Sequence, residues 1–529
     1  MFYFVPYWYG ESKATTFDDT VNQIRMFEAV HENSETIICE YSPQIRCFLH
    51  QQNLSLNKYW SVFDMIQNIE DVNNKIVDFN DLSWPIESEF VYTPFRVNVI
   101  LAGKTFANIS FGLESQLSSV SYFDDDQISK TLIFDDRGFL SSIIYFSAGK
   151  KTVQEYFDVS GIWQIRVTYL TESEKIVINP MSYHRFKKST YHSLNDLIQE
   201  MINYHFANES DLKHATLIIA ANEKYNQLLL NLSYRPSNLV LSFFKNRYEY
   251  KKNEQLLMDE LSLADIVITD TIGQLEDIKE IVVAKNNSHL VNKLQHITPY
   301  DTRFQLGISQ QYKELTILLN TQELSKEEII FVLCTILSCM ADNNLIALSI
   351  ACSEENNAEK IDDYIKQVLV GYYHLDNNVI LNDLQMDNTT DENKLGDRDN
   401  AGDTQQPVGV SLYKRISMHT FQTENDMIQA FEKVRLIIDI SHRPNIYTQI
   451  AGISAGIPQI NLSASPYIIN QQNGLIIQDL SELKKAIDYY LIGLSHWNTA
   501  LVYAVQQMRQ YTNGAIVRKW RHILGEENG

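Results

Sequence analysis

Short apolar segments alternate with amphipathic segments along most of this chain, and that alternation constrains the fold more than any other feature. One series contains TLIIAA (216–221), NLVLSFF (238–244) and DIVITD (265–270), and a second runs from LTILLN to PQINLS after residue 304. Apolar strands that alternate with helices predict parallel sheets covered on both faces. Two such series predict two Rossmann-like domains that face each other across a cleft, with ligands bound at the carboxyl ends of the strands.

A second pattern separates the opening strand, FYFV, from the first series. From Phe95 to about Pro180, short runs of β-branched and aromatic residues are divided by turn signals such as DDRG and DVSG. This regular spacing predicts an antiparallel meander. Because the opening strand precedes the meander and its series follows, the meander is predicted to be inserted into the first domain.

These patterns predict the boundaries of four parts of the chain. Residues 384–409, within the second domain, are rich in Asp and Asn and poor in apolar residues, which predicts an acidic disordered loop. The predicted parts are a first Rossmann-like domain (1–45 and 190–300), an inserted β-sheet domain (46–189), a second Rossmann-like domain (301–495) and a C-terminal helix returning to the first domain (496–529).

Composition excludes several classes of function. The 66 Asp and Glu residues exceed the 44 Lys and Arg residues, and the net charge of -22 would repel nucleic-acid phosphates. Five cysteines without a CxxC pair fit neither a disulfide framework nor a cysteine zinc site, so no metal and no cofactor are predicted. The N-terminus has no basic region before its apolar residues, and other apolar runs are too short to span a bilayer, which predicts a cytoplasmic protein.

Several motifs together carry a family resemblance. They are the opening FYFVPYWYG, FDMIQ at 63–67, DDRGFLSS at 135–142, and AGIPQIN followed by the NG dipeptide near the C-terminus. With them the whole chain resembles the first accessory Sec protein, part of the system by which streptococci and staphylococci export serine-rich-repeat adhesins. It is similar, more distantly, to the O-glycosyltransferases of that system. The resemblance implies a GT-B-like α/β fold with an antiparallel β-sheet domain inserted in the first of two facing Rossmann-like domains.

The resemblance also implies partners and a location. Members of this family work with two sister accessory Sec proteins, with the accessory SecA motor and with the glycosylated serine-rich-repeat adhesin. It implies that the protein is cytoplasmic and associates peripherally with the inner face of the membrane through its complex.

The donor-site residues of related enzymes are missing from this sequence. Retaining GT-B enzymes carry two glutamates eight positions apart, the second five residues before the glycine of a GxP turn. Counting back from Gly456 places Arg443 and Ala451 at these positions, and neither offers a carboxylate. Glu354 and Glu355 follow a strand where a pyrophosphate would need positive charge, and the first loop has Gly10 alone instead of a glycine pair. We therefore predict a non-catalytic protein.

Aromatic and amide side chains at the predicted strand ends are candidates for binding glycans, because aromatic faces stack on sugar rings and amides hydrogen-bond to hydroxyls. Two alternatives stay open, an active glycosyltransferase that uses a UDP-sugar and a pure scaffold without sugar binding. Asp439, Ser441 and His442 are interpreted as a strand-end cap instead of a hydrolase triad. The candidate glycan-binding residues are Tyr7, Trp8, Tyr9, Arg443, Asn445, Tyr467 and Asn473.

Overall fold

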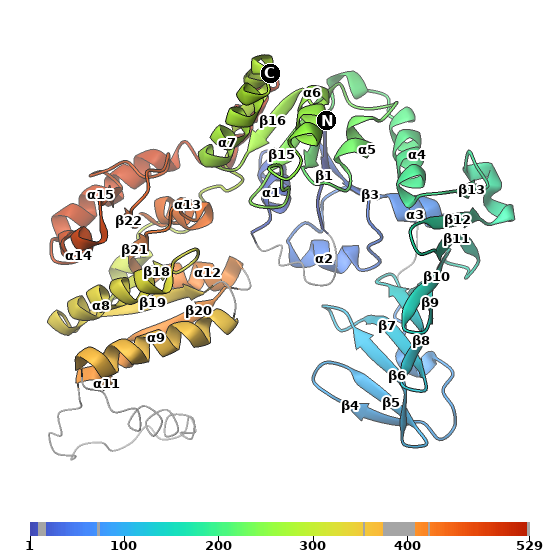
Figure 1. Ribbon diagram of the computed structural model, residues 1–529, viewed down its shortest axis with the longest axis horizontal. Coiled ribbons are helices and arrows are strands. Elements are labelled where there is room, and N and C mark those ends of the chain that lie inside the picture. Colours follow the sequence, from blue (N-terminus) through green and yellow to red (C-terminus); the bar gives the residue numbers. More distant parts are fainter. Residues whose placement is uncertain (9–16, 71–74, 353–354, 374–407, 422–423, 526–529) are drawn as a thin grey trace. The chain divides into compact units, whose positions relative to one another are not determined.

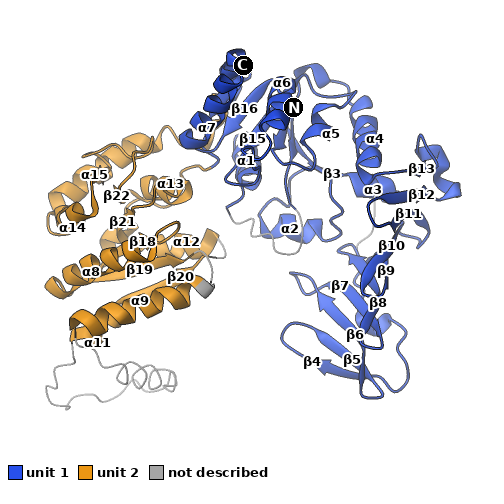
Figure 2. Cartoon of the chain, in the orientation of Figure 1, with its two compact units in different colours: residues 1–299, 520–529 blue, residues 300–519 orange. Residues whose placement is uncertain are grey.

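The computed structural model divides the chain into two compact units, residues 1–299 with 520–529 and residues 300–519 (Figures 1 and 2). Tyr9 and most of the predicted acidic loop lie outside the residues that the structure describes. Those described residues are 1–8, 17–70, 75–352, 355–373, 408–421 and 424–525.

The first unit contains a seven-stranded sheet in which every neighbouring pair is parallel, in the order β17-β16-β15-β14-β1-β2-β3. Its strands are β1 (Phe2–Val5), β2 (Ser34–Ile38), β3 (Tyr59–Ser61), β14 (Thr216–Ala220), β15 (Asn238–Phe243), β16 (Ile266–Thr269) and β17 (Leu294–His296). Its helices are α1 (Asp19–Ala29), α2 (Ile45–Gln51), α3 (Val62–Gln67), α4 (Leu194–Ala207), α5 (Asn226–Leu230), α6 (Glu254–Leu263) and α7 (Ile272–Ala284).

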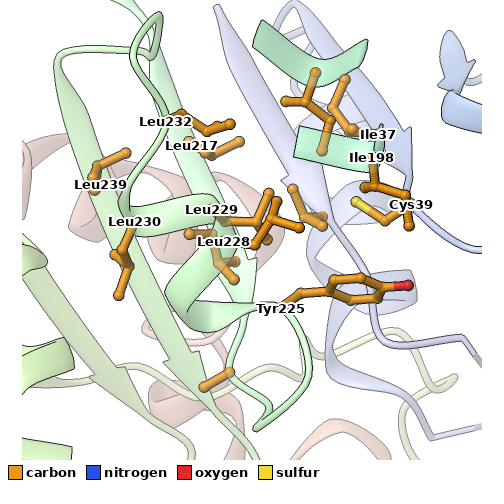
Figure 3. Packing of buried hydrophobic residues seen from close by; sticks show 14 of the residues in the cluster. Ile37, Cys39, Ile198, Leu217, Tyr225, Leu228, Leu229, Leu230, Leu232 and Leu239 are labelled. Atoms are coloured by element: carbon orange, nitrogen blue, oxygen red, sulfur yellow. The ribbon is translucent and has the colours of Figure 1, made fainter. Parts of the chain in front are cut away.

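Aliphatic side chains from the strands and helices of this sheet form one continuous core (Figure 3). Leu217 and Leu239 come from β14 and β15, and Ile198 comes from α4. Side chains cap the helices that cover the sheet: Ser193 accepts from the backbone at the start of α4, and Thr271 does so for α7. Burial on both faces explains why these strands are apolar without alternation.

The inserted domain is a ten-stranded antiparallel sheet in the order β13 to β4. The insertion was predicted to begin at residue 46, but β3 and α3 belong to the first unit's parallel fold. The reason is that Ile37 of β2 pairs with Trp60 of β3. The ten strands are β4 (Glu89–Tyr92), β5 (Val97–Leu101), β6 (Lys104–Phe111), β7 (Leu117–Asp124), β8 (Gln127–Asp135), β9 (Phe139–Ser147), β10 (Lys150–Phe157), β11 (Trp163–Tyr169), β12 (Glu174–Ile178) and β13 (Thr190–Tyr191).

The inserted sheet has two cores. Tyr156, Ile165 and Ile176, from β10 to β12, belong to the same buried cluster as the parallel sheet and α4. Val99 and Val120, nearer the other end, belong to a separate cluster that is covered by aromatic side chains. One end of the sheet is therefore part of the first unit's main core, and the other end is stabilised by its own side chains.

Two of the sequence motifs meet where the inserted sheet joins the parallel fold. Arg137 of the DDRG motif donates from both terminal nitrogens to the two carboxylate oxygens of Asp64, each at 2.8 Å, and Asp64 belongs to the FDMIQ motif. Arg137 also donates to Asp135 at 2.7 and 2.9 Å. Gln67 donates to the Ser141 carbonyl at 2.9 Å and to the Phe157 carbonyl at 2.6 Å. The motifs therefore hold α3 against the inserted sheet.

The glycine of the DDRG motif is required by both conformation and space. Gly138 has a φ of +86°, and a Cβ at this position would overlap the carbonyl oxygen of Lys75. The Lys75 amide in turn donates to the Arg137 carbonyl at 3.0 Å. A side chain at 138 would separate two backbone segments that are hydrogen-bonded to each other.

The second unit contains a six-stranded parallel sheet in the order β20-β19-β18-β21-β22-β23. Its strands are β18 (Leu315–Asn320), β19 (Ile346–Cys352), β20 (Ile416–Thr420), β21 (Val434–Asp439), β22 (Gln459–Asn461) and β23 (Gly474–Ile476). Its helices are α8 (Lys326–Asp342), α9 (Glu355–Tyr373), α11 (Val408–Tyr413), α12 (Glu424–Phe431), α13 (Ile446–Ala455), α14 (Leu483–Leu491) and α15 (Leu494–Met508). Two parallel sheets and an inserted antiparallel sheet confirm the predicted α/β fold class.

The C-terminal segment is divided between the units, whereas the sequence placed all of residues 496–529 with the first domain. In α15, the Trp497 indole donates to the Arg435 carbonyl at 2.8 Å, which attaches this helix to β21. Trp520, within the last helix α16 (Asn513–Ile523), packs edge-to-face on Phe27 in the first unit. Among the described residues, no helix has both the length and the hydropathy needed to cross a membrane.

We expect replacement of Arg137 by Met to destabilise the first unit by about 3 to 5 kcal/mol. The substitution would leave the carboxylates of Asp64 and Asp135 buried without their cation. Urea unfolding followed by tryptophan fluorescence measures the change. Arg96→Met, at an exposed site in the turn between β4 and β5, serves as the control, and equal effects of the two substitutions would contradict the assigned role.

We expect Gly138→Ala to cost about 2 to 5 kcal/mol, because left-handed strain and steric overlap act together. Gly103 has a similar φ of +76° but open space around its missing Cβ, so Gly103→Ala tests strain alone. This control should cost roughly 1 to 2 kcal/mol. Thermal unfolding of both variants measures the difference, and indistinguishable midpoints would show that the contact with Lys75 is unimportant.

Candidate functional site

The carboxyl end of β21 carries a carboxylate that is fully committed to local hydrogen bonds. Asp439 is buried, and its Oδ1 accepts from the Ser441 hydroxyl at 2.6 Å and the Ser441 amide at 3.2 Å. Its Oδ2 accepts from the Asn320 side chain at 2.9 Å and the Asn445 amide at 2.8 Å. These bonds confirm the predicted strand-end cap and give both carboxylate oxygens of Asp439 structural partners.

The two positions that the sequence count predicted as degenerate donor-site positions lie in different environments. Arg443 is exposed in the segment before α13, whereas Ala451 is 1% exposed within that helix. A methyl group buried in a helix cannot hold a ribose or a transferred sugar. Of the other predicted deviations, Gly10 and Glu354 lie outside the described residues.

The candidate residue Asn445 and the glycine of the AGIP turn, Gly456, form the two ends of α13. Asn445 is the N-cap, and its Oδ1 accepts from the Thr448 amide at 3.0 Å while its Nδ2 donates to Gln322 at 3.3 Å. At the other end Gly456 has a φ of +74°, and a Cβ there would overlap the side chain of Leu501. The AGIP turn is thus explained by helix termination and packing alone.

Tyr467 and Asn473 also have structural partners in the second unit. Asn473 is buried, accepts from the Ile469 amide at 2.7 Å and donates to the Tyr467 carbonyl at 2.8 Å. The ring of Tyr467 is buried and lies 5.4 Å from that of Tyr511, measured between centroids. Both side chains stabilise the turn before β23.

The aromatic loop after β1 is divided between core and surface. Trp8 is 4% exposed, its ring lies 4.8 Å from that of Phe48, and its indole N–H donates to Asp18 at 3.1 Å. Tyr7 is half-buried. The structure therefore places Trp8 in the packing of the first unit, and Tyr7 keeps an accessible face.

A buried cluster of charged residues at the carboxyl ends of the first sheet was not predicted from the sequence. Arg247 donates to both carboxylate oxygens of Asp19, at 2.6 and 3.1 Å. Asp270 ends the segment DIVITD, and its Oδ2 accepts from the Lys245 amide at 2.9 Å while its Oδ1 has no hydrogen-bond partner. We call the set of Asp18, Asp19, Arg247 and Asp270 the strand-end charged cluster.

Burial controls protonation in this cluster. It raises the pKa of Asp270 to about 6. The pKa of Asp18 is also raised to about 6, first by burial and then by the negative charge of Asp19. The signal that sequence reasoning missed is the aspartate at the end of an otherwise apolar strand, since such a position faces the ligand-binding edge of a parallel sheet.

Comparison with known proteins identifies the family. The sequence model of the accessory Sec system protein family that is numbered first in the Asp series matches residues 1–527. The chain belongs to this family. The corresponding accessory Sec protein of Streptococcus gordonii is 33% identical over 99% of this chain and 99% of its own length.

Solved structures agree with the family assignment and the fold. A crystal structure of accessory secretory proteins 1, 2 and 3 of Streptococcus pneumoniae contains a chain that is 27% identical, with a TM-score of 0.77 and coverage of 99% of both chains. The pneumococcal O-GlcNAc transferase GtfA, solved with UDP and GlcNAc, is 13% identical, with a TM-score of 0.68 over 99% of this chain and 98% of that one. The second likeness shows that this accessory Sec family member has the GT-B-like fold.

We expect the raised pKa of Asp270 to make stability depend on pH. The folded protein holds this proton more tightly than the unfolded chain, whose aspartates titrate near 3.9. The resulting stabilisation, on the order of 2 to 3 kcal/mol, is fully present below about pH 4 and is lost as the pH rises through about 6. Unfolding free energies of wild type and Asp270→Asn, measured from pH 4 to 7.5, should therefore diverge over this window.

The control for this experiment is Asp196→Asn, on the exposed face of α4. Its difference from wild type should stay constant with pH within about 0.5 kcal/mol. A flat difference for Asp270→Asn as well would contradict the assignment of a raised pKa to that carboxyl group.

Proposed function

We propose that this protein is a non-catalytic, GT-B-shaped component of an accessory Sec complex, which binds sister proteins and the glycans of a serine-rich-repeat adhesin to support its export. One observation carries the non-catalytic part: Ala451 is buried within α13 where related enzymes need a carboxylate. The nearest strand-end acid, Asp439, uses both oxygens for structural hydrogen bonds.

Family membership supports the proposed partners. The pneumococcal relative was crystallised together with accessory secretory proteins 2 and 3, and the similarity extends along the whole chain. We propose an equivalent ternary assembly here, located in the cytoplasm at the inner face of the membrane, where it delivers the adhesin to the accessory SecA motor. Co-purification of the three proteins would test this assembly directly.

Glycan recognition is proposed at the strand ends of the two units. Of the candidates, Arg443 is exposed, and Tyr7 and Asn445 are half-buried, so these three remain accessible to a sugar. Trp8, Tyr467 and Asn473 act instead through packing and turn formation, although they were candidates too. A glycosylated repeat carries many copies of one sugar, so a weak site gains effective affinity through rebinding.

Calorimetric titration distinguishes the three functions that the fold allows. We expect saturable binding of a glycosylated serine-rich peptide and no binding of UDP-N-acetylglucosamine. Arg443→Ala should weaken glycopeptide binding about tenfold, since it removes a charged hydrogen-bond donor. The matched control is Lys414→Ala, which removes an exposed cation elsewhere in the second unit and should leave the affinity unchanged.

Other outcomes would contradict specific parts of the proposal. Saturable UDP-sugar binding followed by sugar transfer would show that the protein is an enzyme. No response to either ligand, with the ternary complex intact, would leave a scaffold without sugar recognition. Equal losses in the Arg443 and Lys414 variants would place the glycan site elsewhere.

A further inference from the structure

Three potential metal ligands converge on the first unit, away from the strand-end sites described above. They are Glu35 of β2, His205 in the last turn of α4, and Glu209 in the turn that follows. One ligand atom from each residue lies within 4.8 Å of the other two. Glu35 is far from the other two in the sequence, and the packing of α4 on the sheet brings it next to them.

Two of these ligand atoms are buried without a hydrogen bond. Glu35 is 2% exposed, and its Oε2 has no hydrogen-bond partner. The Nε2 atom of His205 is equally buried and also has none. The two atoms face each other at 3.5 Å, longer than the usual 2.7 to 3.2 Å of an N–H···O hydrogen bond. Buried polar atoms usually have a partner, so the Glu35 oxygen and the His205 nitrogen are expected to share a third group that lies between or beside them.

The separation of the two atoms suits a shared metal ion. Zinc binds histidine nitrogen at about 2.0 to 2.1 Å and carboxylate oxygen at about 2.0 to 2.2 Å, usually in tetrahedral geometry. Two ligands at those distances and a tetrahedral angle are about 3.4 Å apart. The observed 3.5 Å between Glu35 and His205 therefore needs little adjustment.

The surroundings hold the histidine ring in place. Trp60 of β3 stacks on His205 with 4.3 Å between ring centroids and an interplanar angle of 18°. Tyr3 of β1 meets the same ring edge-on at 6.4 Å. These contacts fix the plane in which Nε2 can reach a ligand, as outer partners do in known metal sites.

Charge at the site also favours a cation. Lys58 contacts Glu35 through the other carboxylate oxygen, Oε1, at 3.0 Å, and the Lys58 side chain is 64% exposed. It can neutralise one of the two glutamates and still leave Oε2 available. A divalent ion would compensate the second carboxylate.

We propose that Glu35, His205 and Glu209 form a zinc site that clamps the end of α4 to the parallel sheet. Glu35 pairs with Tyr3 near the amino ends of the strands, the edge opposite to that where ligands of such sheets react. A structural role is therefore assigned to the ion, with three protein ligands and one position for water. The sequence predicted no metal because its reasoning considered cysteine spacing, and this site uses none.

The test uses the untagged full-length chain, stripped with a chelator and then dialysed against a small excess of Zn²⁺. Wild type should retain one zinc per chain, and its unfolding temperature should rise with added zinc. His205→Gln and Glu209→Gln should each lower the zinc affinity by at least tenfold and remove the shift. The matched control His192→Gln changes an exposed histidine just before α4 and should behave as wild type.

Two comparisons keep the result interpretable. Because His205→Gln disturbs the stacking on Trp60, far-ultraviolet circular dichroism checks its fold, and Glu209→Gln tests the site without touching that ring. Wild type that retains no more zinc than the two variants would overturn the proposal. So would a zinc-independent unfolding temperature that responds to pH alone, since Glu35 and His205 would then form only an ion pair.

Discussion

The fork of Arg137 between Asp64 and Asp135 is the interaction on which the arrangement of the first unit depends. It lies where a helix of the parallel fold meets the inserted sheet, and it is largely buried. Burying three charges is costly, and apolar replacements of such groups are often at least as stable. The fork also fixes orientation, because a planar guanidinium can donate to both carboxylates only when they lie in suitable directions around it. Gln67 and Gly138, beside it, restrict the same junction through backbone contacts.

Local sequence patterns predicted the fold class. Contacts between distant segments explain why two predicted domain boundaries differ from those in the structure. Apolar alternation was sufficient for both parallel sheets, and turn spacing was sufficient for the inserted one. The strand β3 has only three residues, too few to show a repeating pattern of apolar side chains in the sequence. It is recognised only from its pairing with β2 in the structure. Likewise α15 has the pattern of any amphipathic helix, and the bond from Trp497 to Arg435 decides which unit it joins.

The candidate site was predicted less well than the fold, because the exposure of its side chains also depends on contacts between segments. Counting back from the turn at Gly456 led to Arg443 and Ala451, but the exposed Arg443 and the buried Ala451 differ because of how α13 packs. Asn473 looked available for a ligand because its hydrogen-bond partners are backbone groups, which no residue pattern displays. Tyr467 looked available because its packing against Tyr511 joins segments that are distant in the sequence. In the second unit, the turn at Gly456 and the N-cap Asn445 are explained by capping and packing, which a sequence motif does not distinguish from a role in binding.

The position of β1 in its sheet has a consequence for synthesis. Phe2 pairs on one side with Ser34 and on the other with Thr216, so β1 lies between one neighbour that follows it soon in the sequence and one that follows it much later. At the usual 5 to 20 residues per second, the second neighbour emerges roughly 10 to 40 s after the first strand. The hairpins of the inserted sheet connect neighbouring segments and can close within that interval. The nascent chain therefore carries an apolar strand with one open edge until β14 arrives, a period in which a chaperone has an obvious substrate.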